Sequence, residues 1–336
     1  METTVTQAVT QNAELVWRKQ NWLRRIGIPS LALSLIGIAA FLLYRALNRY
    51  RLEEIGESLT NIPASRIALA AFFAAASYLC LTGFDWLALR YVGKRLPYRH
   101  AALASFCSLS LGHNIGFAAL SSGAIRYRFY SRWGVSGQNV AKIILFCGVT
   151  VGVGLTGLGG CALLLPSELA AKVTGLSEMA AAGLGVGCLL VLILYLALCA
   201  WLRKPLRIRH WLIEMPPLRL AFAQAVVGPL NFACVAACLY QTLASMGELA
   251  YFAVATVYVI ANVTALISHI PGGLGVIETV VLYLLPGGNV IGALIAFRVI
   301  YFLIPLCIGG SLFILTELFF KRHKLALRSS KSSAVG

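Results

Sequence analysis

The chain has 336 residues, of which 59% are hydrophobic and only 12% are charged. A soluble domain carries about 25% charged residues, so this composition excludes an ordinary soluble protein and indicates a helical membrane protein. The formal net charge is +16, but no nucleic acid partner is needed to explain it, because the short cytoplasmic loops of membrane proteins collect Lys and Arg.

The N-terminal region is polar and basic, and it lacks the small-residue cleavage site of a signal peptide. We therefore expect a cytoplasmic segment over residues 1–25, followed by a first span that is retained. We predict a single transmembrane domain over 26–320 and a basic cytoplasmic tail over 321–336. Six stretches are long and apolar enough to cross roughly 30 Å of hydrocarbon as plain helices: 26–44, 66–89, 143–165, 180–202, 220–243 and 291–318.

Two further apolar stretches are interrupted, and these breaks are the most informative features of the chain. Stretch 101–125 contains Gly112-His113-Asn114-Ile115-Gly116, and stretch 249–285 contains Pro271-Gly272-Gly273-Leu274-Gly275-Val276-Ile277-Glu278. A break at membrane depth exposes backbone N–H and C=O groups that lipid cannot satisfy, so it is tolerated only where protein or water surrounds it. We expect the function to lie at these breaks.

The distribution of Lys and Arg predicts how the broken segments sit in the membrane. If each segment crossed once, the basic residues would be spread almost evenly over the two sides. If each returns to the side from which it came, as a re-entrant helical hairpin or a pair of crossing helices does, most basic residues fall on one side. By the positive-inside rule that side is the cytoplasm. This arrangement places both termini in the cytoplasm.

The same topology predicts an inverted repeat. Gly123-Ala124-Ile125-Arg126 aligns with Gly275-Val276-Ile277-Glu278, and Asn139-Val140 aligns with Asn289-Val290. The first broken segment would enter from the cytoplasm and the second from outside, so we expect repeats at roughly 66–165 and 220–318. Inverted repeats around discontinuous helices are typical of alternating-access transporters, whose site lies near the midplane. A helical topology without repeats is the alternative.

Few charged side chains fall inside the predicted spans. Glu278 follows the second break, and Arg298 lies well inside the last span. One interpretation is a buried ion pair that only fixes helix packing. The other is a binding site in which Arg298 holds a phosphate with its planar fork and Glu278 takes an amine or a proton. We favour the binding site, because the two residues flank a backbone break.

Other polar residues near the breaks have two interpretations each. Arg126 and Arg128 follow the first break among aromatic side chains, a pattern that suits lipid phosphates at the interface or simple anchoring at the cytoplasmic face. His113 and His269 adjoin the breaks, where they can relay protons or hydrogen-bond a neighbouring helix. Asp85 is expected to be a structural partner for Arg90 or for a backbone group.

Motifs for enzyme chemistry fail. The run Gly152-Val153-Gly154-Leu155-Thr156-Gly157 matches the dinucleotide-binding pattern, but it lies within a span, where small residues allow close helix packing. No Ser/His/Asp or Cys/His set has credible spacing, and most cysteines lie in apolar spans, so neither a disulfide framework nor a metal site is implied. We expect no cofactor and no enzymatic activity.

Three motifs resemble a known family. Pro271-Gly272-Gly273-x-Gly275-x-x-Glu278, Arg298-x-x-Tyr301-x-x-x-Pro305 and Gly123-x-x-Arg126-Tyr127-Arg128-x-Tyr130 resemble the transmembrane region of lysylphosphatidylglycerol synthase/flippases and of stand-alone YbhN-like inner-membrane proteins of bacteria. The likeness covers about residues 20–320. It implies a multi-pass protein of the bacterial plasma (inner) membrane that moves a phospholipid, sometimes aminoacylated, between leaflets, with Glu278, Arg126 and Arg298 along the headgroup path. The bifunctional members also carry a soluble aminoacyl-transferase domain, which we do not find after Phe320, so we do not expect this chain to attach lysine to a lipid.

We therefore expect an all-α polytopic membrane protein that acts as a phospholipid flippase or lipid transporter, with a membrane phospholipid as its substrate. The predicted substrate-binding residues are Glu278, Arg298, Arg126, Arg128, His113, Asn114, Gly272, Gly273, Gly275 and Tyr301. The alternatives are a secondary transporter for a small anion or amphiphile, and a non-transporting membrane subunit that recruits an envelope-lipid enzyme. An integral lipid-modifying enzyme ranks last.

Overall fold

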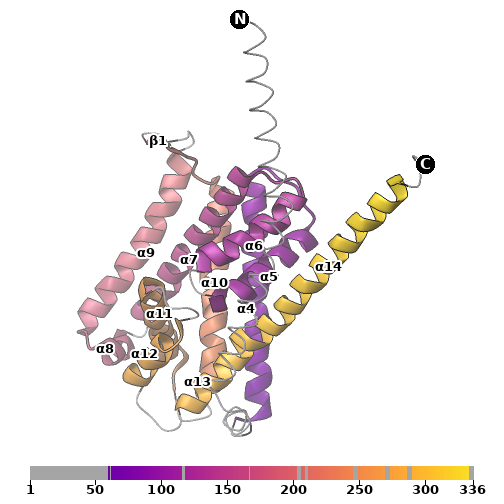
Figure 1. Ribbon diagram of the computed structural model, residues 1–336. Helices are drawn as coiled ribbons and strands as arrows, with labels where there is room; N and C mark the ends of the chain where they lie inside the picture. Colours follow the sequence, from indigo (N-terminus) through magenta and orange to yellow (C-terminus); the bar gives the residue numbers. More distant parts are fainter. Residues whose placement is uncertain are drawn as a thin grey trace, which may run out of the picture. The chain divides into compact units, whose positions relative to one another are not determined.

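The computed structural model describes residues 60, 62–115, 118–165, 167–202, 206–208, 211–244, 249–268, 273–285 and 290–332. The predicted segment 1–25, the first span at 26–44, His269 and Gly272 lie outside this part of the chain. The described part is helical except for a small β-hairpin, which confirms the predicted all-α class (Figure 1). That hairpin, β1 (Leu206–Ile208) and β2 (Trp211–Ile213), was not predicted.

Four of the predicted plain spans are continuous α-helices with bounds close to those expected. They are α4 (Ala64–Tyr91), α7 (Gly137–Leu164), α9 (Glu178–Trp201) and α10 (Leu218–Leu243). Among the described residues, six helices are long and apolar enough to cross a membrane. Five of these coincide with predicted spans, and the sixth, α11 (Tyr251–Ser268), is the first arm of the second broken segment. A short helix, α8 (Ser167–Thr174), connects α7 and α9.

The antiparallel helices α4 and α10 form the centre of the bundle. The Arg66 guanidinium at the start of α4 donates to Gln241 Oε1 near the end of α10, at 2.8 Å. Midway along both helices, Ser77 Oγ donates to Asn231 Oδ1 at 2.7 Å. Buried side-chain hydrogen bonds of this kind hold transmembrane helices in register, because lipid offers no competing partner.

Helix α7 crosses α10 at small residues. A Cβ atom built on Gly154 would lie 2.7 Å from the carbonyl of Gly228, closer than any side chain can approach backbone. Gly154 belongs to the glycine run at 152–157, so the prediction that these residues permit close packing is confirmed. The backbones meet there because neither helix carries a side chain at the crossing.

The three loops after α4, before α7 and before α10 meet at one end of the bundle. There Tyr91 Oη donates to the backbone carbonyl of Glu214 at 2.6 Å, and Lys142 Nζ donates to the Glu214 carboxylate at 2.8 Å. We call this the Tyr91 end, and the opposite end, where α4 begins, the Arg66 end. The predicted topology requires these basic loops to share a side. Their assignment to the cytoplasm stays a prediction.

The first broken segment forms a helical hairpin, α5 (Tyr98–Ile115) and α6 (Ala118–Arg132). At its open end, the ring of His100 lies 4.4 Å from the ring of Trp133, which follows α6. Near its turn, Ser121 Oγ donates to the carbonyl of Gly112 at 3.3 Å. The segment therefore starts and finishes at the Tyr91 end, as Figure 1 shows. That it is re-entrant in the membrane stays a prediction.

The second broken segment pairs α11 with the shorter α12 (Val276–Leu284). A Cβ built on Gly273, just before α12, would lie 3.0 Å from Ala265 of α11, so the two arms are in close contact. At the start of α11, the ring centroid of Tyr251 lies 5.9 Å from that of Tyr240. The guanidinium carbon of Arg66 lies 6.0 Å from the same Tyr240 ring. This hairpin thus starts at the Arg66 end, opposite to the first. The inverted repeat itself stays a prediction.

The last predicted span is not a plain α-helix, which corrects the expectation for residues 291–318. It consists of α13 (Val290–Arg298), the π-helix η3 (Val299–Leu303) and α14 (Ile304–Ser332). Pro305 has no N–H to donate to the carbonyl of Tyr301, and Tyr78 Oη of α4 donates to that carbonyl at 3.4 Å. Single π-helical turns occur frequently at functional sites. Helix α14 continues beyond residue 320 into the segment predicted as a tail.

Candidate functional site

Glu278 and Arg298 form an ion pair at the second break. Arg298 Nε donates to Glu278 Oε1 at 2.6 Å, and Arg298 Nη2 donates to Oε2 at 3.0 Å, a two-point contact that fixes both side chains. Arg298 Nη2 also donates to the carbonyl of Gly273 at 3.0 Å. The arginine thus binds both the acid and the broken backbone beside it.

The glycines of the break shape this contact. Gly273 and Gly275 have φ angles of +58° and +85°, a region that glycine adopts without steric cost. The turn directs the Gly275 N–H at Glu278 Oε2, 2.8 Å away, so the carboxylate also caps the start of α12. The Arg298 side chain is 5% exposed and that of Glu278 is 20% exposed, so the acid is the more accessible partner.

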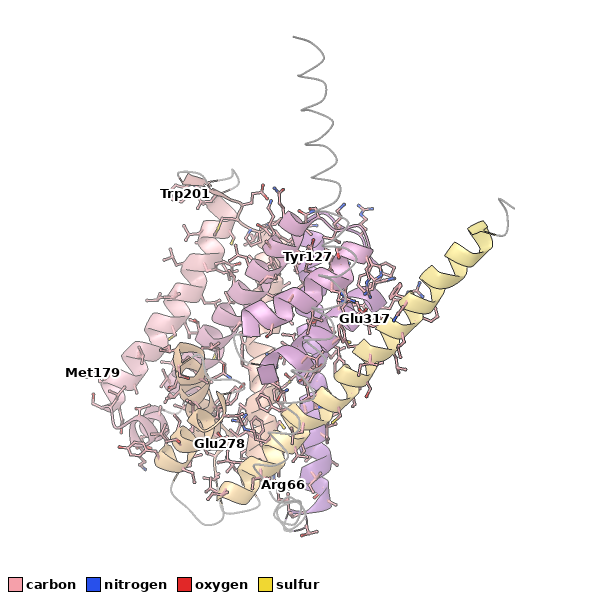
Figure 2. All side chains as sticks on the ribbon, in the orientation of Figure 1. Arg66, Tyr127, Met179, Trp201, Glu278 and Glu317 are labelled. Atoms are coloured by element: carbon pink, nitrogen blue, oxygen red, sulfur yellow. The ribbon has the colours of Figure 1, made fainter. Side chains whose placement is uncertain are left out.

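This pair lies close to the middle of the bundle. One helical turn after Arg298, Tyr301 Oη is 3.0 Å from Oγ of Ser77, which is at the midpoint of α4. A turn of helix rises about 5 Å. Arg298 therefore lies that distance from the level of Ser77 and Tyr301, toward the Arg66 end. Figure 2 shows Glu278 in the half of the bundle that contains Arg66.

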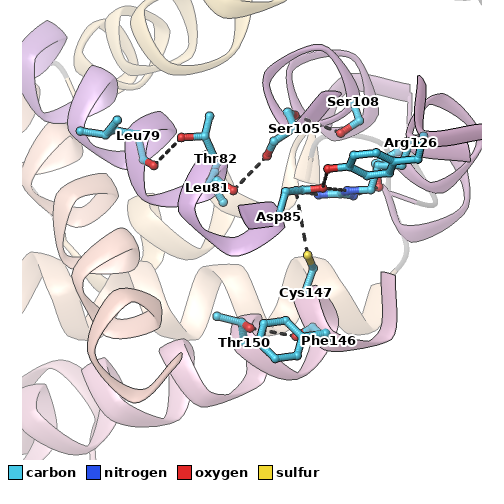
Figure 3. Close-up of polar contacts among 12 residues, drawn as sticks. Leu79, Leu81, Thr82, Asp85, Ser105, Ser108, Arg126, Phe146, Cys147 and Thr150 are labelled. Atoms are coloured by element: carbon cyan, nitrogen blue, oxygen red, sulfur yellow. Dashed lines mark hydrogen bonds and ion pairs between the residues drawn. The ribbon is translucent and has the colours of Figure 1, made fainter. Parts of the chain in front are cut away.

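A second buried pair, Asp85 with Arg126, was missed in the sequence. Arg126 Nε donates to Asp85 Oδ1 at 2.9 Å, and Nη2 donates to Oδ2 at 2.8 Å (Figure 3). The third guanidinium nitrogen donates to Ser122 Oγ at 3.1 Å, and Tyr130 Oη donates to Asp85 at 2.8 Å. Both charged side chains are almost fully buried, with exposures of 3% and 0%.

The expected partner of Asp85, Arg90, is the wrong one. The Arg90 guanidinium lies over the ring of Trp86 at 3.6 Å. Residues five apart on an α-helix point in different directions, whereas α6 brings Arg126 directly to Asp85. A phosphate that binds Arg126 through Nε and Nη2 would have to displace Asp85, because both nitrogens donate to its carboxylate.

The two buried pairs lie on opposite sides of the bundle's middle. Asp85 follows Ser77 by two turns of α4, roughly 12 Å toward the Tyr91 end, whereas Arg298 lies toward the Arg66 end. Between them is a layer of aromatic and hydroxyl side chains that includes Tyr301. A charged group that travelled through the bundle would meet one pair in each half.

Phe302 links the tip of the first hairpin to the pair at the second break. Its ring centroid lies 6.5 Å from the ring of His113 and 4.9 Å from the guanidinium carbon of Arg298. The neighbouring Asn114 donates to the carbonyl of Ser110 within its own helix, at 2.9 Å. Phe302 is thus near both His113 of the first hairpin and Arg298 of the ion pair.

Arg128 lies apart from both pairs, on the face of α6 that contacts α14. Its Nε and Nη2 donate to the two carboxylate oxygens of Glu317, at 2.7 and 2.5 Å, and Arg132 Nη2 also donates to Glu317 at 2.7 Å. Figure 2 shows Glu317 in the half that contains Tyr127, away from Arg66.

The predicted site residues therefore divide into separate groups. Gly273, Gly275, Glu278 and Arg298 are in one cluster, with Tyr301 one turn away and His113 across Phe302. Arg126 and Arg128 bind other carboxylates, and Gly272 is outside the described residues. Within the described ranges, no three His, Cys, Asp or Glu side chains gather as metal ligands would.

Comparisons with known proteins cover nearly the whole fold. Residues 30–309 match the family described as the lysylphosphatidylglycerol synthase TM region. The chain is 34% identical over 289 residues to the uncharacterized protein slr0712 of Synechocystis sp., covering 83% of this chain and 89% of that protein. It is 30% identical over 277 residues to the inner membrane protein YbhN of Escherichia coli, covering 79% and 84%. The resemblance seen in the motifs is confirmed.

Proposed function

Because this chain belongs to the family of the lysylphosphatidylglycerol synthase transmembrane region, we propose that it is a lipid transporter that moves a phospholipid, aminoacylated or not, between the leaflets of the bacterial inner membrane. A multi-pass helical membrane protein with a role related to membrane lipids follows from the family alone. The transport activity is our proposal, and it involves neither a cofactor nor covalent chemistry.

The observation that carries the proposal is the Glu278–Arg298 pair at a backbone break near the middle of the bundle. Removing two ions from water costs several kcal/mol for each, and apolar residues of similar volume often stabilise a fold as well as a buried pair does. Charged residues inside membrane proteins accordingly mark substrate paths. The contact of His113 with Phe302 also brings the tip of the first hairpin close to this ion pair.

Transport would proceed by exchange of ionic partners. The phosphate of a headgroup takes the place of Glu278 on the planar fork of Arg298. Glu278, which would otherwise be left as an uncompensated buried charge, is neutralised by the headgroup's ammonium or by a proton. A headgroup that carries both a phosphate and a cation separates Glu278 from Arg298 at the lowest energetic cost. Each of the two side chains then has a new ionic partner, so neither is left as an unpaired charge.

Arg126 offers the next position for the phosphate, in the half of the bundle nearer the Tyr91 end. There the lipid would compete with Asp85, which is also held by Tyr130 Oη. The acyl chains stay in the bilayer, so only the polar headgroup needs a path through the protein. The opposite directions of the two helical hairpins fit the alternating exposure that such transport needs.

A fluorescent-phospholipid translocation assay in proteoliposomes tests the proposal. We expect Glu278→Gln to slow translocation at least tenfold relative to the wild type. Glu214→Gln is the matched control, because it removes the same charge from an exposed ion pair with Lys142, and it should leave the rate unchanged. Equal rates for Glu278→Gln and the wild type would remove Glu278 from the mechanism.

The same assay separates the two alternatives. A secondary transporter for a small anion would move that anion in liposomes while fluorescent lipid stays in its leaflet. A subunit that recruits an envelope-lipid enzyme would tolerate Glu278→Gln, and its function would depend on the loop 203–219 instead. Loss of lipid movement on neutralising Glu278, with the control intact, supports the flippase against both.

A further inference from the structure

We propose that the seam between α6 and α14 is a second lipid site, which binds the phosphate of an anionic phospholipid at Arg132. This site is separate from the Glu278–Arg298 pair and does not depend on the transport mechanism. Its ligand is a lipid of the surrounding leaflet that remains bound and joins the first hairpin to the last helix. The seam combines positive charge, an exposed apolar surface and two buried polar atoms that have no hydrogen-bond partner among the described residues.

The seam carries an excess of positive charge. Arg128 and Arg132 share the single carboxylate of Glu317, and both arginines lie within hydrogen-bond distance of it. Among the described side chains of this cluster, two positive charges face one negative charge, and all three groups are only partly exposed. One additional negative charge would neutralise the cluster, which an anionic lipid supplies and a zwitterionic lipid does not.

Arg132 also has an unused donor. Its Nη1 atom is buried and has no hydrogen-bond partner among the described residues, although Nη2 of the same group binds Glu317. A buried donor without a partner destabilises a protein, so a ligand oxygen at Nη1 would be stabilising. The Phe320 ring, 5.0 Å from the guanidinium carbon, holds the group in place from the side of α14.

His100 supplies a second polar atom at this end of the hairpin. Its Nδ1 is the other buried side-chain atom without a hydrogen-bond partner among the described residues, and its ring meets Trp133 edge-on. Burial lowers the pKa of His100, and the positive charge of Arg99 lowers it further. The neutral imidazole still has one N–H to donate. A phosphate beside His100 can therefore accept a hydrogen bond from a ring that carries no charge of its own.

Large apolar side chains are exposed on α14 beside Glu317, and a tyrosine is exposed on α6 beside Arg128. Tyr127 of α6 is 53% exposed, and Leu318 and Phe319 of α14 are 51% and 68% exposed. In a bilayer these surfaces contact acyl chains, and tyrosine is enriched at headgroup level. A phosphate at Arg132 with two tails along this surface uses both features, whereas free phosphate uses only the charge. We therefore assign the site to a phospholipid.

Native mass spectrometry of the full chain, released from nanodiscs of equal phosphatidylglycerol and phosphatidylcholine, tests this site. The wild type should retain phosphatidylglycerol selectively. Arg132→Gln should weaken that retention about tenfold, because a charge-assisted hydrogen bond and a surface charge are lost together. Lys142→Gln is the control, since it removes one positive charge from the same end at an exposed pair with Glu214.

Equal losses in Arg132→Gln and Lys142→Gln would overturn the proposal, since they would indicate attraction by surface charge alone. Arg132→Lys keeps the charge without the second nitrogen and should bind with intermediate strength, so it tests the site if Arg132→Gln is unstable. Inorganic phosphate should not displace the bound lipid, and displacement would overturn the assignment to a phospholipid. The readout is retained lipid and not lipid translocation, so a failure here leaves the transport proposal standing.

Discussion

Arg298 and Glu317 lie on one continuous helical segment, and each forms an ion pair with a different hairpin. Arg298 binds Glu278 of the second hairpin, and Glu317 binds Arg128 and Arg132 of the first. The π-helix η3 lies between them, and roughly 28 Å of helix separates the two contacts. The last helix thus connects two hairpins that start at opposite ends of the bundle.

The contact between the first hairpin and the last helix should depend on Glu317. Replacing it by Gln leaves two partly buried arginines without a carboxylate, so we expect a loss of about 1–3 kcal/mol in the free energy of unfolding. Hydrogen exchange should accelerate in residues 98–132 and stay unchanged in 251–284. Equal acceleration in both hairpins would contradict this local role. Glu214→Gln should change neither segment.

The Asp85–Arg126 pair should be important for stability. Asp85→Asn leaves a buried arginine uncompensated, which costs about 3–5 kcal/mol, and the protein should lose several degrees of melting temperature in detergent. The double variant Asp85→Leu with Arg126→Met removes both charges and should recover most of that stability. If the double variant melts no higher than Asp85→Asn, the penalty does not come from the unpaired charge.

The crossing of α7 and α10 should not accept a side chain. A Cβ at position 154 would be 2.7 Å from the Gly228 backbone and 2.8 Å from Phe232, whereas one at Gly152 meets nothing within 4 Å. We expect Gly154→Ala to cost about 1–3 kcal/mol by overpacking. Gly152→Ala should be neutral or slightly stabilising, because alanine favours helix. Similar melting temperatures for the two variants would show that the helices do not cross there.

The predicted orientation is open to direct labelling. Lys94 lies at the Tyr91 end and Lys172 on α8, and both are exposed. A membrane-impermeant maleimide applied to intact spheroplasts should label Lys172→Cys, and it should label Lys94→Cys only after permeabilisation. The wild type, with its native cysteines, gives the background. The reverse pattern would place the basic loops outside and contradict the positive-inside assignment.

The sequence predicted the helices and the breaks because apolar length and glycine runs are local signals. The Glu278–Arg298 pair was foreseen because both residues flank one break. The partner of Asp85 was not, because Arg126 is 41 positions away and α4 is apolar on all sides, so no polar face indicated where Asp85 points. The π-helix was not predicted either. Pro305 shows that one backbone hydrogen bond of the helix is missing, but it does not show that the turn before it contains an additional residue.

The most direct test of the account removes both charges of the central pair. Glu278→Gln combined with Arg298→Gln leaves no unpaired ion, so the protein should keep a melting temperature close to that of the wild type. We predict that it nevertheless loses at least tenfold in the rate of fluorescent-phospholipid translocation in proteoliposomes, because neither a phosphate nor an ammonium group finds its partner. A folded double variant that moves lipid as fast as the wild type would show that the pair serves only helix packing, and it would contradict the account.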